Sequence, residues 1–119
     1  MNAINDNARR APLRTAEPFR SPEAAWFWCW GILRARRDGV GASFGTQRQV
    51  CEPDDVVMTL DRLYRQRRVD LAHARVLRVY GERGTPPDHG KPQERADQRL
   101  WREAMDRLGV ALRARGIVA

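Results

Sequence analysis

Four stretches of the chain place apolar residues three and four positions apart. This spacing gives an α-helix one buried face, and no stretch alternates convincingly as a strand does. The predicted helices run from Pro22 to about Arg37, from Pro53 to about Arg67, from Leu71 to Tyr80, and from about Pro92 to at least Leu108. The pattern predicts an all-α fold, a small bundle of about four helices.

Residues that favour helix ends bound these stretches. Ser21 is a good N-cap, and Pro22 suits the first position of the helix that follows. Pro53 takes the same first position in the second helix, and Asp70 caps the third. Gly81 is expected to end the third helix because glycine adopts the left-handed backbone of a helix C-terminus at little cost.

The end of the last helix leaves two alternatives open. If the helix continues through Gly109, then Gly116 is its natural terminator, and Ile117 packs on Leu112 in a Schellman pattern. If it breaks at Gly109, residues 109–119 form a short strand.

The second, third and last helices each carry one apolar face that is expected to enter the core. His73 follows a helix start and is expected at the surface, and Arg75 and Arg78 lie on the far side of the third helix. The residues expected to be buried are Val56, Val57, Leu60, Leu63, Tyr64, Ala72, Val76, Leu77, Val79, Tyr80, Ala96, Leu100, Trp101, Ala104, Met105 and Leu108.

The first helix is apolar on two sides. Its aromatic run, residues 26–30, puts Trp26 and Cys29 on one stripe, whereas Trp28 and Ile32 fall nearly opposite. A helix of this kind is either central in the core or covered by a partner. Trp28 and Ile32 are therefore the candidate protein-interface residues.

The length of 119 residues suits one domain, which we place at residues 21–119. Residues 1–20 are predicted to be a disordered basic arm, since they lack periodicity. The glycine-rich connection from Asp38 to Cys51 is long enough to be mobile or functional. It lacks the Gly-Lys-Ser/Thr ending of a phosphate-binding loop.

The charge balance is strongly basic. Lys and Arg number 22 against 15 Asp and Glu, which gives a net charge of +7, and Lys91 is the only lysine. Two explanations for the arginines stay open: the codon bias of a GC-rich genome, or the bidentate grip of guanidinium on phosphate. Under either one, such a chain attracts polyanions.

Two groups of arginines are the candidate nucleic-acid contacts. One lies where the second and third helices meet in a helix-turn-helix-like corner, and the other recurs along the last helix. The alternatives are an ordinary helical hairpin with a basic rim, and a solvated face with Arg99–Glu103 and Arg102–Asp106 pairs. The candidates are Arg67, Arg68, Arg75, Arg78, Arg95, Arg99 and Arg102.

The sequence gives little support for a metal site or for disulfide bonds. Cys29, Cys51, His73 and His89 have spacings that fit no zinc pattern, and two cysteines build no disulfide framework. No cofactor is expected. The chain has neither an N-terminal apolar segment nor a run long enough to cross a membrane, so we expect a soluble cytoplasmic protein without membrane contact.

Catalysis is the least supported class of function. The serines are Ser21, which is used as a cap, and Ser43. Asp54 and Asp55 are adjacent on a helix and point apart, so they do not work as a pair. Because no nucleophile, base and orienting group are visible together, we expect that the protein is not an enzyme.

The segment Asp70–Gly81, DLAHARVLRVYG, resembles the opening helix of region 4 in bacterial sigma factors and the corresponding helix of phage late-gene antiterminators. The resemblance implies a DNA-facing role in transcription, with RNA polymerase as a partner. A Pro-Gly loop and one long helix containing Trp101 follow here, so the family's recognition helix is not carried over. The matching residues are Leu71, Arg75, Val76, Leu77, Tyr80 and Gly81.

Together these features predict a small basic DNA-binding protein, a bacterial or phage transcription regulator. The alternative is a protein–protein module, an adaptor or inhibitor that docks through Trp28 and Ile32. The DNA-binding prediction requires that the arginines gather on one side of the folded chain, without each being neutralised by a neighbouring carboxylate.

Overall fold

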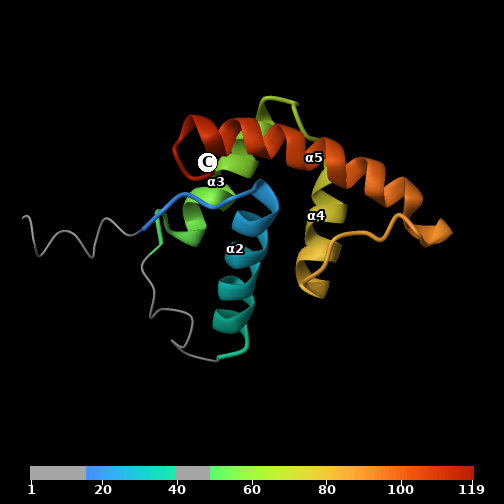
Figure 1. Cartoon of the computed structure of the whole chain (residues 1–119), viewed down its shortest axis with the longest axis horizontal. Helices are drawn as coiled ribbons and strands as arrows, with labels where there is room; N and C mark the ends of the chain where they lie inside the picture. The colour runs from blue at the N-terminus through green and yellow to red at the C-terminus, as the bar shows by residue number, and fades with distance from the viewer. Residues whose placement is uncertain (1–15, 40–48) are drawn as a thin grey trace, which may run out of the picture.

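The computed structural model describes residues 16–39 and 49–119, and these residues confirm the all-α prediction. Figure 1 shows the arrangement of the helices. They are α2 (Pro22–Arg37), α3 (Pro53–Arg65), α4 (Leu71–Arg83), the 3-10 turn η1 (Pro92–Glu94) and α5 (Arg95–Ala114).

Helix α5 lies across the other three helices, and α2 packs between α3 and α4 (Figure 1). Within the described chain, α3 and α4 do not pack on each other; each contacts α2 and α5 instead. The corner between α3 and α4 is therefore open, unlike an ordinary helical hairpin, in which the two helices pack on each other. This opening leaves residues 66–68 and Asp70 accessible beside α4.

The two ends of the described domain are held together. The Phe19 N–H donates to the Ile117 carbonyl at 2.8 Å, and the Ala119 N–H donates to the Phe19 carbonyl at 2.9 Å. Phe19 and Val118 thus form an isolated parallel bridge. The predicted arm at residues 1–20 falls mostly on residues 1–15, which lie outside the described chain, as does most of the glycine-rich connection (residues 40–48).

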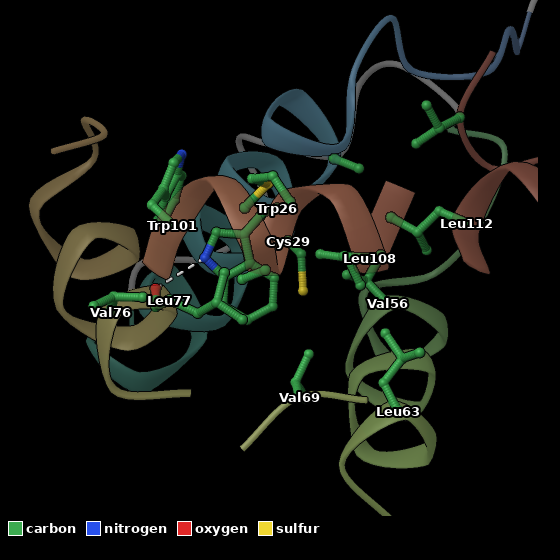
Figure 2. Packing of buried hydrophobic residues seen from close by; sticks show 14 of the residues in the cluster. Trp26, Cys29, Val56, Leu63, Val69, Val76, Leu77, Trp101, Leu108 and Leu112 are labelled. Carbon is green, nitrogen blue, oxygen red and sulfur yellow. Dashed lines mark hydrogen bonds between the residues drawn. The ribbon is translucent and has the colours of Figure 1, made fainter. Parts of the chain in front are cut away.

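The core gathers between α2 and the three helices around it, and Trp26 lies at its centre (Figure 2). Trp26 is 3% exposed, and its indole N–H donates to the Leu77 carbonyl at 2.9 Å. Cys29 is fully buried, as expected, and burial raises the pKa of its thiol to about 12. Both cysteines are free.

Helix α5 continues through Gly109 to Ala114, so the strand alternative is wrong. The Ile117 N–H donates to the Leu112 carbonyl at 2.9 Å, and Gly116 adopts a positive φ of 74°. This is the Schellman ending considered above, with Ile117 and Leu112 both buried. Gly109 is retained because a Cβ there would lie 3.1 Å from the Pro22 ring.

Helix α4 extends past Gly81, which the sequence had placed at its end. A Cβ at Gly81 would lie 3.0 Å from Trp26 Nε1 and 3.1 Å from the Trp30 ring, so this glycine permits close helix packing. The helix ends at Arg83, and Gly84 supplies the left-handed residue with a φ of 85°. The prediction chose the wrong glycine because both lie near the end of one apolar pattern.

Five residues expected in the core are exposed instead. Val57, Tyr64 and Val79 are 39%, 45% and 40% exposed, and Ala72 and Ala96 are exposed as well. The four on α3 and α4 face outward because no described helix covers the outer sides of these two helices, and Ala96 lies in the first turn of α5.

Candidate nucleic-acid interface

The connection between α3 and α4 is a tight C-terminal turn followed by a buried anchor. The Arg67 N–H donates to the Tyr64 carbonyl at 3.0 Å, and the Arg68 N–H donates to the Leu63 carbonyl at 2.9 Å. These bonds form a Schellman motif, in which glycine ordinarily takes the left-handed position. Here Arg67 takes it, with a φ of 60°. Val69 then enters the core.

A left-handed backbone at a residue with a side chain costs stability. We therefore expect Arg67→Gly to raise the free energy of unfolding by about 1 kcal/mol. Urea denaturation of the two proteins measures the difference. Arg68→Gly is the matched control, since Arg68 has no positive φ and glycine there is expected to destabilise. Equal effects at the two positions would contradict the assignment of strain to Arg67.

A polar cleft of about 590 Å³ lies beside this turn. Three arginines and two carboxylates surround it, and a buried histidine forms part of its wall. One side comes from the connection and the start of α4, and the other comes from α5. The lining residues are Arg67, Arg68, Val69, Asp70, His73, Glu103 and Arg107.

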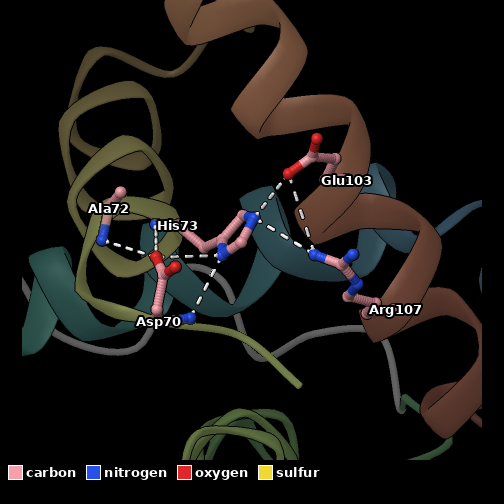
Figure 3. A network of polar contacts seen from close by, with 5 residues as sticks. All are labelled: Asp70, Ala72, His73, Glu103 and Arg107. Atoms are coloured by element: carbon pink, nitrogen blue, oxygen red, sulfur yellow. Dashed lines mark hydrogen bonds and ion pairs between the residues drawn. The ribbon is translucent and has the colours of Figure 1, made fainter. Parts of the chain in front are cut away.

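His73 links the two sides of the cleft (Figure 3). Its Nδ1 accepts from the Asp70 N–H at 3.1 Å, so the proton of the neutral ring resides on Nε2, which donates to Glu103 Oε1 at 2.9 Å. An Arg107 Nη atom lies 3.2 Å from the same Nε2. With both ring nitrogens engaged, His73 holds α4 on α5.

The prediction that His73 lies at the surface is wrong: it is 5% exposed. Helix α5 covers it, and the sequence of α4 carries no sign of that contact. Arg107, which belongs to the same network, was not among the predicted site residues. Its spacing places it on a flank of α5, and only the packing of α5 on α4 brings that flank to the cleft.

The two carboxylates of the cleft are already stabilised within the chain. The backbone N–H of His73 is the main cause that lowers the pKa of Asp70, with further help from the Ala72 N–H. The hydrogen bond from His73 is the main cause that lowers the pKa of Glu103. Asp70 and Glu103 are therefore ionised at neutral pH, and each already accepts hydrogen bonds from within the chain. Arg67 and Arg68, by contrast, form no ion pair among residues 16–39 and 49–119.

Arg75, another predicted nucleic-acid contact, forms an ion pair within the chain. Its Nη2 lies 2.5 Å from Asp97 Oδ1 on α5, and the Tyr80 hydroxyl donates to Asp97 Oδ2 at 2.7 Å. The Arg75 bond, followed by the Tyr80 bond, lowers the pKa of Asp97. This arrangement joins α4 to α5 and gives Arg75 a structural task.

The lowered pKa of Asp97 predicts a pH dependence. Its contribution to stability is present above the ordinary carboxyl pKa and is lost as pH falls through the lower, folded-state pKa, that is, below about 4. We expect Asp97→Asn to be less stable than wild type at neutral pH and to lose less on acidification. Thermal melts across pH measure this. Asp106→Asn, on the exposed side of α5, should keep the wild-type profile.

The remaining predicted arginines are exposed but not all on one side. Arg78 lies on α4 without an ion pair in the described chain. The row Arg95, Arg99 and Arg102 lies on α5, and Arg102 points about 140° around the helix from Arg107. Arg102 therefore points away from the cleft, whereas Arg99 lies one turn before Glu103, and its charge contributes to lowering the pKa of Glu103.

The carboxylate pairs that would have neutralised the α5 row do not form. Glu103 turns to His73 and Arg107, and the Arg102 guanidinium donates to Gln98 at 3.3 Å. Other acids serve the fold as well: Glu94, for example, binds Arg83 at 3.1 Å. Within the described chain, exposed arginines without a carboxylate partner include Arg62, Arg67, Arg68, Arg78, Arg95, Arg99 and Arg102.

Of the two candidate protein-interface residues, Trp28 packs against the segment that precedes α2. Trp28 is half-buried, and its ring centroid is 5.1 Å from that of Phe19. Ile32 is half-buried too. Part of the second apolar side of α2 is therefore covered by the chain itself, and the role of Trp28 and Ile32 as a docking site stays a prediction.

No three His, Cys, Asp or Glu side chains converge as metal ligands do among the described residues. None of the described helices is both long and apolar enough to span a membrane. Comparison of the chain with protein-family models, curated proteins and solved structures finds no significant match.

Proposed function

We propose that the chain binds duplex DNA through contacts to phosphate, with Arg67 and Arg68 as the main contacts. The observation that carries this proposal is the backbone of Arg67. At position 67, glycine would adopt the left-handed backbone at a lower cost in stability, yet the chain has an arginine there. The guanidinium of Arg67 has no ion pair among the described residues. Because the Arg67 side chain adds strain and forms no hydrogen bond or ion pair in the described chain, we infer that it serves a contact outside the chain.

The surroundings of Arg67 suit an anionic backbone. Arg68 and Arg107 line the same cleft, and the acids there are already partnered. Guanidinium groups donate two parallel hydrogen bonds to a phosphate, which makes arginine well suited to this task. Arg78 points about 140° around α4 from His73, so it is a separate contact, and Arg75 contributes less because Asp97 holds it. The row Arg95, Arg99 and Arg102 on α5 is a secondary contact.

The biological role that fits this activity best is transcription regulation. The resemblance of residues 70–81 to region 4 of sigma factors and to phage antiterminators supports a DNA-facing role near RNA polymerase. In this proposal, α4 supplies Arg78, and the turn before it supplies Arg67 and Arg68. The protein needs no cofactor for such contacts.

A salt series tests the proposal directly. Fluorescence anisotropy of a labelled mixed-sequence duplex, titrated with the full chain, is expected to show binding at low salt. The logarithm of the binding constant should fall linearly with the logarithm of salt concentration, because each phosphate contact releases counterions. Absence of binding at low salt, or binding that does not respond to salt, would overturn the proposal.

A further inference from the structure

A second hollow lies on the other side of the Arg67–Asp70 segment. It is a groove of about 680 Å³ with an apolar floor, formed where α3 and α4 diverge. Arg67, Val69 and Asp70 separate it from the polar cleft, since they line both. The groove is lined by Tyr64, Arg65, Arg67, Val69, Asp70, Leu71 and Ala72.

The exposure of Leu71 is not explained by packing within the fold. Leu71 is 71% exposed, more than any other large apolar side chain in the described chain. Tyr64, which lines the same groove, is 45% exposed, and nearly two turns earlier on α3 Met58 is 56% exposed in a smaller adjoining hollow. Exposed apolar side chains that share a groove mark a binding surface, whereas single ones do not.

The charged residues around the groove favour a negatively charged ligand. Arg67 lines the groove and has no ion pair among the described residues, whereas Arg65 lines it and is paired with Asp61. Arg62, also without an ion pair in the described chain, lines the smaller adjoining hollow. The one carboxylate in the lining, Asp70, accepts from the Ala72 N–H at 2.9 Å and the His73 N–H at 3.3 Å, so the start of α4 already balances it. An anionic occupant therefore meets uncompensated positive charge.

We propose that this groove docks an acidic segment of a partner protein that inserts one bulky apolar side chain between Tyr64 and Leu71. The floor of Val69, Leu71 and Ala72 provides aliphatic contact for a flexible side chain, and Arg62, Arg65 and Arg67 face the flanking carboxylates. Apolar contact supplies affinity, and the charges supply orientation and partner choice. This groove differs from the cleft beside the proposed DNA contact, although Arg67, Val69 and Asp70 line both.

The test uses short peptides with one central leucine between acidic residues, titrated into the isotope-labelled full chain and followed by amide shifts. Shifts confined to residues 62–72 are expected. A peptide with central alanine, or one with lysine flanks, should bind at least about fivefold more weakly, since it lacks the buried side chain or the charge. Shifts that are absent, spread over the domain, or equal for all three peptides would overturn the proposal.

Leu71→Ala is the matching variant, and Val110→Ala is its control, because Val110 is 62% exposed on α5 outside the groove. Leu71→Ala should weaken the acidic peptide about fivefold and leave the melting temperature and DNA affinity unchanged. Val110→Ala should change none of these. If Leu71→Ala weakens duplex binding instead, the groove belongs to the nucleic-acid surface and the peptide proposal fails. Failure of all duplex binding would defeat only the proposed function.

Discussion

Replacing Trp26 with alanine is expected to lower the free energy of unfolding by about 4 kcal/mol. Trp26 is 3% exposed, packs against Trp30 with ring centroids 5.7 Å apart, and donates to the Leu77 carbonyl inside the core. Its removal opens a cavity between α2 and α4 and deletes a buried hydrogen bond. Because a domain of this size is only marginally stable, urea denaturation should show a large fall in the midpoint.

Trp28→Ala is the control for the same aromatic run. Trp28 is half-buried against Phe19, so its loss should cost about half as much as the loss of Trp26. Equal losses at the two positions would contradict the assignment of Trp26 to the centre of the core. If Trp28→Ala instead abolishes a cellular activity while leaving stability close to wild type, the alternative of a docking module on α2 gains support.

The helices and the main core were predictable because they depend on local signals. Ser21 caps α2, and its Oγ accepts from the Ala24 N–H at 3.1 Å, as expected from its place before Pro22. The spacing of Val56 and Leu63 placed both in the core. Such features depend on residues three or four positions apart, and these are neighbours whatever the tertiary fold.

The sequence was less informative wherever two distant segments meet. Gly81 lies inside α4 because two tryptophans of α2 approach it, and His73 is buried because α5 crosses it. Val57 and Val79 have apolar spacing but no helix over them, since α3 and α4 diverge. The candidate site, too, was only partly predictable from the sequence. Arg67 and Arg68 were chosen for their charge, but the strain at Arg67 depends on a turn geometry that ordinarily selects glycine.

The double variant Arg67→Gln/Arg68→Gln is expected to weaken duplex binding between about tenfold and a hundredfold at moderate salt. Each arginine that neutralises a phosphate contributes about one unit to the slope of the logarithm of affinity against the logarithm of salt. The slope should therefore fall by about two. The salt series of fluorescence anisotropy measures both quantities, and glutamine keeps the polar side chain while removing the charge.

A matched control separates a local contact from the general attraction of a basic protein. Arg36→Gln/Arg115→Gln removes the same charge from two exposed positions outside the cleft, at the ends of α2 and α5. General attraction predicts equal losses for the two double variants, because both reduce the net charge by the same amount. Direct contact predicts that only the Arg67/Arg68 variant loses slope, since counterions are released where phosphate is neutralised. Equal losses would mean that the corner is not the DNA contact, even if the chain binds DNA.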